Sequence, residues 1–160
     1  MIYQIEISLK KEFRDKHGEH VKHDIAELGV KGITEVKYLP VYRIEGNISL
    51  QEAERISSRL LIDPITEQYL VVDLEDKSYK RAAAEKGLSV EIWFKKGVTD
   101  TVAGSVAKAV KDIGVKEALK IDTGHKFVIK GNVPAAVIRQ AAAKILYNSM
   151  IQECKIQGKG

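Results

Sequence analysis

The segment Ile5-Glu6-Ile7-Ser8-Leu9-Lys10-Lys11 returns 85 positions later as Val90-Glu91-Ile92-Trp93-Phe94-Lys95-Lys96. The correspondence runs on without a gap to Gly46-Asn47, which matches Gly131-Asn132, and hydrophobic character is kept at most matched positions. Two copies of this length are too few for a solenoid, so each copy is interpreted as a small domain. The chain of 160 residues is therefore predicted to be a pseudo-symmetric pair of domains.

Both halves show the same order of hydrophobic periods. Residues 3–9 and residues 88–94 alternate apolar and polar side chains, which indicates a strand with one buried face. A helical spacing of apolar residues follows each strand, at Val21, Ile25 and Leu28 and again at Val106, Val110 and Ile113. Each helix is predicted to end at a glycine, Gly29 or Gly114, where a left-handed cap costs least.

The second part of each half is predicted to be a hairpin, a helix and a final strand. Residues 33–45 are divided at Leu39-Pro40, because proline removes a donor from a strand ladder, and the matching segment turns at Thr123-Gly124. Ser49 and Glu52 have the spacing of a helix capping box. The final strands are expected at residues 65–72 and 150–156.

The predicted fold class is α+β, with two tandem β-α-β-β-α-β repeats that form a pseudo-dimer with antiparallel sheets and helices on one face. Repeat 1 is placed at residues 1–73 and repeat 2 at residues 88–160, with a charged, alanine-rich linker at residues 74–87. A repeat of about 70 residues has a thin core of its own, so the two copies are expected to share a face.

The composition favours a soluble cytoplasmic protein. Hydrophobic residues make up 44% and charged residues 30%, and no apolar run approaches the ~20 residues of a membrane helix. The start of the chain lacks the pattern of a secretory leader. The single cysteine, Cys154, has no partner for an internal disulfide and lies in a predicted strand, so we expect a structural role.

The charge pattern argues against a nucleic-acid partner. The net charge of +4 comes from 26 basic and 22 acidic residues that are interleaved along the chain, with no arginine-rich block. Nucleic-acid binding needs cationic residues gathered on one face. A solvated, mixed-charge surface is the simpler interpretation.

One histidine cluster has the spacing of metal ligands. His17, His20 and His23 are spaced three residues apart on a predicted helix, and Asp24 lies four residues after His20. The second copy has Val102, Ser105 and Lys108 at the three histidine positions, and exposed polar histidines account for the pattern equally well. No metal site is therefore predicted.

A helix start also resembles an anion site. Gly97-Val98-Thr99-Asp100 precedes a helix whose free amides could bind an anion, but Asp100 would repel a phosphate and is expected to cap the helix instead. The chain has no P-loop, no Gly-x-Gly-x-x-Gly motif and no recognisable pair of nucleophile and base. We predict no catalytic residue and no cofactor.

The first copy contains a recognisable series of short motifs, which are Leu9-Lys10-Lys11, Asp15, Gly18, Leu28-Gly29-Val30 and Leu60-Leu61-Ile62-Asp63-Pro64-Ile65-Thr66-Glu67-Gln68-Tyr69. In these motifs it resembles the PurS family, the small subunit of phosphoribosylformylglycinamidine synthase. The second copy is similar to the PurS-like N-terminal region of the large, fused form of the synthase, through residues 90–100 and 145–152. The resemblance covers nearly the whole chain apart from the linker and the last few residues.

This resemblance implies a scaffold. In the family, the large synthetase subunit uses ATP to activate formylglycinamide ribonucleotide, a glutaminase subunit releases ammonia, and PurS dimers bridge the two without catalytic groups. The tandem chain would imitate that dimer covalently, which keeps both halves at a high effective concentration. The implied partners are a PurL-type synthetase subunit and a PurQ-type glutaminase subunit, with further homo-oligomerisation left open.

The predicted partner interface centres on the ends of the first strands. The family usually carries a Gly-Lys pair before its third strand; the first copy has Leu39-Pro40 there, whereas the second keeps Gly124 followed by His125. The second copy is therefore expected to offer the better contact surface. The predicted interface residues are Lys10, Lys11, Lys95, Lys96, Thr99, Gly124 and His125.

Two other functions remain open on the sequence. Tandem small domains with this element order also occur in amino-acid-sensing ACT pairs, which bind effectors beside a glycine loop after the first strand. Gly97 fits that position in the second copy, while Glu12 occupies it in the first. A weaker third reading is a nucleic-acid binder, which a salt-dependent shift assay would detect.

Overall fold

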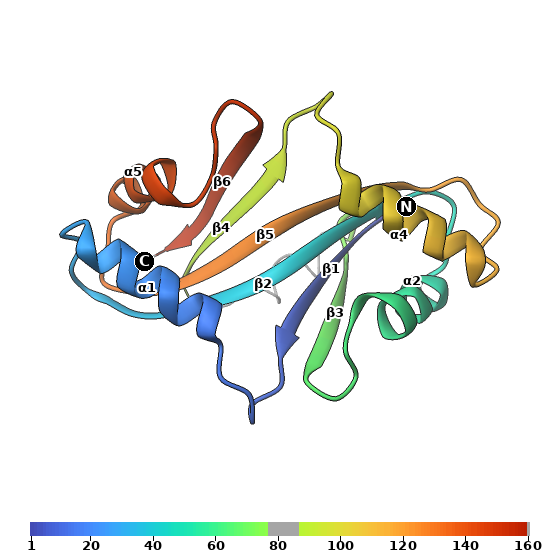
Figure 1. Cartoon of the computed structure of the whole chain (residues 1–160), viewed down its shortest axis with the longest axis horizontal. Coiled ribbons are helices and arrows are strands. Elements are labelled where there is room, and N and C mark those ends of the chain that lie inside the picture. The colour runs from blue at the N-terminus through green and yellow to red at the C-terminus, as the bar shows by residue number, and fades with distance from the viewer. Residues whose placement is uncertain (77–86, 160) are drawn as a thin grey trace. The chain divides into compact units, whose positions relative to one another are not determined.

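The computed structural model describes residues 1–76 and 87–159 and confirms the α+β class and the antiparallel strand pairing (Figure 1). The described elements of the first repeat are β1 (Ile2–Leu9), α1 (Lys16–Glu27), β2 (Ile33–Glu45), α2 (Leu50–Ile56), the π-helical turn η1 (Ser57–Leu61) and β3 (Glu67–Asp73). Those of the second repeat are β4 (Gly87–Phe94), α4 (Thr101–Asp112), β5 (Lys120–Gly131), α5 (Ala135–Ile145) and β6 (Gln152–Lys159). Most of the predicted linker, residues 77–86, lies outside the described residues.

The strands are hydrogen-bonded in the order β3-β1-β2-β5-β4-β6, and each repeat places its first strand between its other two. In the first repeat, Ile5 of β1 pairs with Tyr42 of β2 on one side and with Val71 of β3 on the other. In the second repeat, β4 pairs in the same way with β5 and β6. Strands β3 and β6 are therefore the edges of the sheet.

The two predicted hairpins are wrong, because β2 and β5 are continuous strands. The last pair of the β1–β2 ladder is Glu6 with Val41, so Pro40 lies just beyond it and removes no donor from that ladder. In the second repeat the β4–β5 ladder ends at the pair of Trp93 with Gly124. Pro40 and Gly124, which suggested turns in the sequence, thus lie where the β1–β2 and β4–β5 ladders end, within strands that continue past them.

The described residues form two compact units. Unit 1 holds those of Met1–Phe13, Pro40–Ala83 and Thr99–Thr123, and unit 2 holds those of Arg14–Leu39, Ala84–Val98 and Gly124–Gly160. The chain passes between the units inside β2, after Leu39, and inside β5, after Thr123. These are the same two places at which the sequence predicted a turn.

The core of unit 1 combines both repeats. Its strands β1 and β2 and its helix α2 come from the first repeat, but Val110 at the end of α4 and Val115 just after it come from the second. Both valines are buried against the first-repeat side chains. The buried cluster consists of Tyr3, Ile5, Ile7, Ile44, Ile48, Ala53, Ile56, Val110 and Val115.

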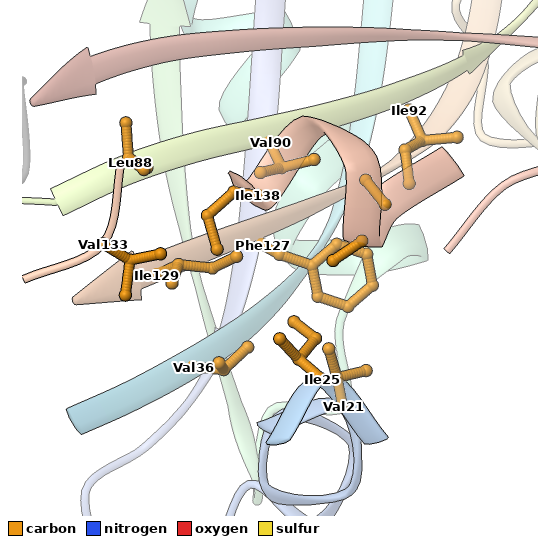
Figure 2. Close-up of a cluster of buried hydrophobic side chains, with 12 residues drawn as sticks. Val21, Ile25, Val36, Leu88, Val90, Ile92, Phe127, Ile129, Val133 and Ile138 are labelled. Atoms are coloured by element: carbon orange, nitrogen blue, oxygen red, sulfur yellow. The ribbon is translucent and has the colours of Figure 1, made fainter. Parts of the chain in front are cut away.

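The core of unit 2 mirrors this arrangement. Val21 and Ile25 of α1 belong to the first repeat, and they point toward side chains of β4, β5 and α5 from the second (Figure 2). The buried cluster consists of Val21, Ile25, Val36, Leu88, Val90, Ile92, Phe127, Ile129, Val133, Ile138, Ala141 and Ala142. The repeats therefore exchange their first helices, which goes further than the expected shared face.

The predicted helix patterns hold, with one exception. Val21 and Ile25 are buried, whereas Leu28 is 41% exposed because it lies at the C-cap of α1, past the face that meets the strands. Gly29 follows with a φ of 88°, which confirms the predicted left-handed helix end. Ser49 caps α2 by accepting a hydrogen bond from the Glu52 N–H at 3.1 Å.

Candidate partner interface

The structure places the seven predicted interface residues in both units. Lys10, Lys11 and Thr99 belong to unit 1, while Lys95, Lys96, Gly124 and His125 belong to unit 2. The β4–β5 ladder, which ends at Trp93 with Gly124, brings the last four to one end of unit 2. Four of the five predicted residues of the second copy therefore gather on unit 2, while the fifth, Thr99, lies in unit 1.

Each strand that precedes the lysines ends beside a turn. In unit 2 the Lys95 N–H donates to the Ile151 carbonyl at 2.8 Å, and in unit 1 the Lys10 N–H donates to the Thr66 carbonyl at 2.9 Å. These carbonyls lie in residues 148–151 and 63–66. The strand starts predicted at residues 150 and 65 are wrong by two residues, because tight turns precede β6 and β3.

The turn of unit 2 is held by a polar side chain at each end. The Asn148 Oδ1 atom accepts from the Met150 N–H at 3.0 Å, and the Gln152 Oε1 atom accepts from the Asn148 N–H at 2.9 Å. The Asn148 carbonyl accepts from the Gln152 N–H at 2.8 Å. An asparagine that bonds the backbone two residues on is a turn signal, and this signal could have been read from the sequence.

The turn of unit 1 repeats this network with charged side chains. The Asp63 Oδ1 atom accepts from the Ile65 N–H at 2.9 Å, and the Glu67 Oε1 atom accepts from the Asp63 N–H at 2.8 Å. Each turn carries a large apolar side chain at its outermost point. Ile65 is 74% exposed and Met150 is 83% exposed, the two highest values among the large hydrophobic side chains of the described residues.

We name these two surfaces the unit 1 tip and the unit 2 tip. The unit 1 tip consists of residues 10–12 and 63–67, and the unit 2 tip consists of the matching residues 95–97 and 148–152. In both tips the hydrogen-bonded turn fixes the backbone, so the exposed apolar side chain is presented from an ordered position.

The N-termini of α1 and α4 are capped by aspartates that also reach a strand. Asp15 accepts from the Gly18 N–H and from the Tyr38 N–H, each at 2.8 Å. Asp100 accepts from the Ala103 N–H at 2.9 Å and from the Thr123 N–H at 2.8 Å. The predicted cap at Asp100 is confirmed, and its carboxylate occupies the amides that an anion would need.

Replacing either aspartate with alanine should destabilise the fold by about 1–3 kcal/mol, because a helix cap is lost and a strand N–H loses its acceptor. Urea unfolding of Asp15→Ala and Asp100→Ala measures the change. The isosteric Asp15→Asn keeps one acceptor oxygen and should lose less stability than the alanine variant. A loss below about 0.5 kcal/mol in both alanine variants would show that these bonds contribute little.

An aromatic cluster lies beside His125 in unit 2. The His17 ring stacks on Tyr38 with centroids 3.8 Å apart, and the Tyr38 hydroxyl lies 2.6 Å from His125 Nδ1. The buried Phe127 ring packs 5.2 Å from Tyr38. Tyr38 is not among the residues predicted from the sequence. The positions that match His17, Tyr38 and His125 in the other copy carry no ring, being Val102, Thr123 and Pro40, whereas Tyr42 matches Phe127.

The remaining candidate residues have ordinary structural partners. His20 lies 3.5 Å from an Asp24 oxygen, and His23 lies 3.0 Å from a Glu27 oxygen. Within the described ranges, no three histidine, cysteine or acidic side chains are grouped as metal ligands. Burial raises the pKa of the Cys154 thiol, which keeps it protonated and a poor nucleophile at neutral pH.

Close packing accounts for the glycine at position 124. A Cβ atom there would lie 2.6 Å from the Ile92 carbonyl oxygen and 2.8 Å from the Trp93 ring. The strand can pass the buried tryptophan only without a side chain at this point.

Among the described residues, no helix is long and apolar enough to cross a membrane.

Comparison with known proteins identifies the family. A family model described as PurS, phosphoribosylformylglycinamidine (FGAM) synthase, matches residues 2–75 and again residues 88–160. No curated protein matches the chain. The family match assigns a role in FGAM synthase, in purine biosynthesis, and implies association with other subunits of that enzyme. The chain belongs to the PurS family and carries the family's unit twice, in tandem.

Proposed function

We propose that this chain is a non-catalytic scaffold of FGAM synthase that links a PurL-type synthetase subunit to a PurQ-type glutaminase subunit. The observation that carries the proposal is the family match to both copies within one chain. The duplicated tips add support, because a molecule with two similar, preformed contact surfaces is suited to joining other subunits. The exchange of first helices supports the proposal further. It packs each repeat against the other within one chain, so their pairing does not depend on protein concentration.

The proposed contacts are the residues predicted from the sequence, with unit 2 favoured. Lys95 and Lys96 are exposed at one end of that unit, and His125 is exposed on the neighbouring strand. Lys10, Lys11 and Thr99 are proposed as the weaker contacts of unit 1. Gly124 contributes through the close packing of β5 on Trp93 rather than through a side chain.

Reconstitution tests the scaffold role. The chain is mixed with purified synthetase and glutaminase subunits at saturating glutamine and Mg-ADP, and the species are resolved by size-exclusion chromatography with light scattering. We expect one complex that contains all three proteins. FGAM formation should require the chain when glutamine supplies the ammonia, and should depend on it less when excess ammonium is added. A folded chain that binds neither subunit would refute the proposal.

A further inference from the structure

The two tips have the same backbone but different surface chemistry. At the unit 1 tip, Lys10 and Lys11 are accompanied by three carboxylates, from Glu12, Asp63 and Glu67. The matching positions of the unit 2 tip keep both lysines but replace the carboxylates with Gly97, Asn148 and Gln152. Asn148 and Gln152 preserve the hydrogen bonds of the turn, so the change removes negative charge without changing the backbone.

The lysines are also used differently in the two tips. The Lys10 ammonium donates to the Pro64 carbonyl of its own turn at 2.6 Å. Ser149 replaces that proline in the unit 2 tip, and Lys95 and Lys96 are both exposed there. The nearest carboxylate along β6 is Glu153, which pairs opposite Trp93 and lies past the turn. The unit 2 tip thus presents two cations and no carboxylate of its own.

The two tips also differ in their exposed apolar side chains. Ile65 is followed by Thr66 in the unit 1 tip, whereas Met150 is followed by the exposed Ile151 in the unit 2 tip. Single exposed hydrophobic residues are common and carry no meaning alone. Here two adjacent apolar side chains lie on an ordered turn beside two lysines. The Lys95 N–H donates to the Ile151 carbonyl at 2.8 Å, which joins residues 95–97 to the turn at residues 148–152, and the two segments lie side by side in Figure 1.

We propose that the unit 2 tip docks in an apolar depression bordered by carboxylates on another subunit of FGAM synthase, and that the unit 1 tip does not bind this acidic site. The inference rests on the proposed scaffold function. Met150 and Ile151 fill the depression, since a methionine side chain adapts to irregular apolar surfaces. Lys95 and Lys96 face the carboxylates, which favours encounter and selects this tip over its less basic counterpart.

Matched variants of the two tips test this proposal. Met150→Asp and Ile65→Asp each put a charge at an equivalent, highly exposed turn position, so both proteins should keep the melting temperature of the unaltered chain. Binding to the purified synthetase and glutaminase subunits is measured separately by titration calorimetry. Met150→Asp should weaken binding to one of these subunits about tenfold or more, while Ile65→Asp should change it by less than about threefold.

Charge reversal gives an independent readout. The double variant Lys95→Glu with Lys96→Glu should weaken the same binding and remove most of its dependence on salt between low and physiological ionic strength. The matched double variant Lys10→Glu with Lys11→Glu should leave the binding and its dependence on salt nearly unchanged.

The possible outcomes separate the two proposals. If the unaltered chain binds neither subunit, the scaffold function fails. If it binds and Met150→Asp binds equally well, the unit 2 tip is not the docking surface. Equal losses for Met150→Asp and Ile65→Asp would overturn the assigned difference between the tips.

Discussion

Neither repeat should fold as a monomer when the chain is divided between them. Residues 1–76 alone lack Val110 and Val115, which cover the buried side chains of unit 1, and residues 88–160 alone lack Val21 and Ile25 of unit 2. Burying one such aliphatic side chain contributes about 1.5–3 kcal/mol, while the stability of a whole domain is only about 5–15 kcal/mol. Each fragment should therefore be unfolded, or should pair with a second copy whose own first helix fills the vacant place.

Mixing the two fragments should restore the fold as a one-to-one complex, which analytical ultracentrifugation and circular dichroism can measure. As a control, a protease site inserted between residues 77 and 86 allows the intact chain to be cut after folding. The cut protein should stay together in buffer and separate only in denaturant. A folded monomer of either fragment would contradict the exchanged packing.

Truncating the side chain of Ile25, in the first helix of the first repeat, should destabilise strands β4 and β5 of the second repeat. Ile25 is 0% exposed and packs in the cluster that contains Val90 and Phe127. Ile25→Ala should lower the free energy of unfolding by about 2–5 kcal/mol, because it removes buried methyl groups and leaves a cavity. Hydrogen exchange should show the greatest loss of protection in β4 and β5.

Two matched variants make this result specific. Leu28→Ala changes the same helix at a 41% exposed position and should alter stability by less than about 0.5 kcal/mol. Ile56→Ala removes a fully buried side chain of unit 1 and should reduce protection in β1 and β3 instead. If Ile25→Ala instead exposed β1 before β4, the assignment of α1 to unit 2 would be incorrect.

Local features of the fold could be predicted from the sequence because their causes are local. The alternation at residues 3–9 identified a strand, and Gly29 and Ser49 identified helix ends. The same logic failed at Pro40, where a proline beyond the β1–β2 ladder is compatible with a continuous strand. Proline lacks the backbone N–H, and only the pairing register shows whether an N–H at that position would take part in a ladder hydrogen bond.

The candidate interface was predictable only in part. The lysine pairs were found because they recur at the ends of matching strands, at positions 10–11 and 95–96. The turns that carry Ile65 and Met150 were mistaken for strands, since a short apolar run does not distinguish the two. Asp63 and Asn148, each two residues before the exposed side chain, were the signals that should have been weighed.

The repeated unit, several of its helix ends and its apolar faces could all be predicted from the sequence alone. It could not determine which strands each first helix covers, because Val21 with Ile25 and Val106 with Val110 have the same spacing and similar volume. Either helix satisfies the hydrophobic pattern of either set of strands. The exchange is visible only in the folded chain, which changes unit after Phe13 and after Val98, just before each first helix, and returns inside β2 and β5.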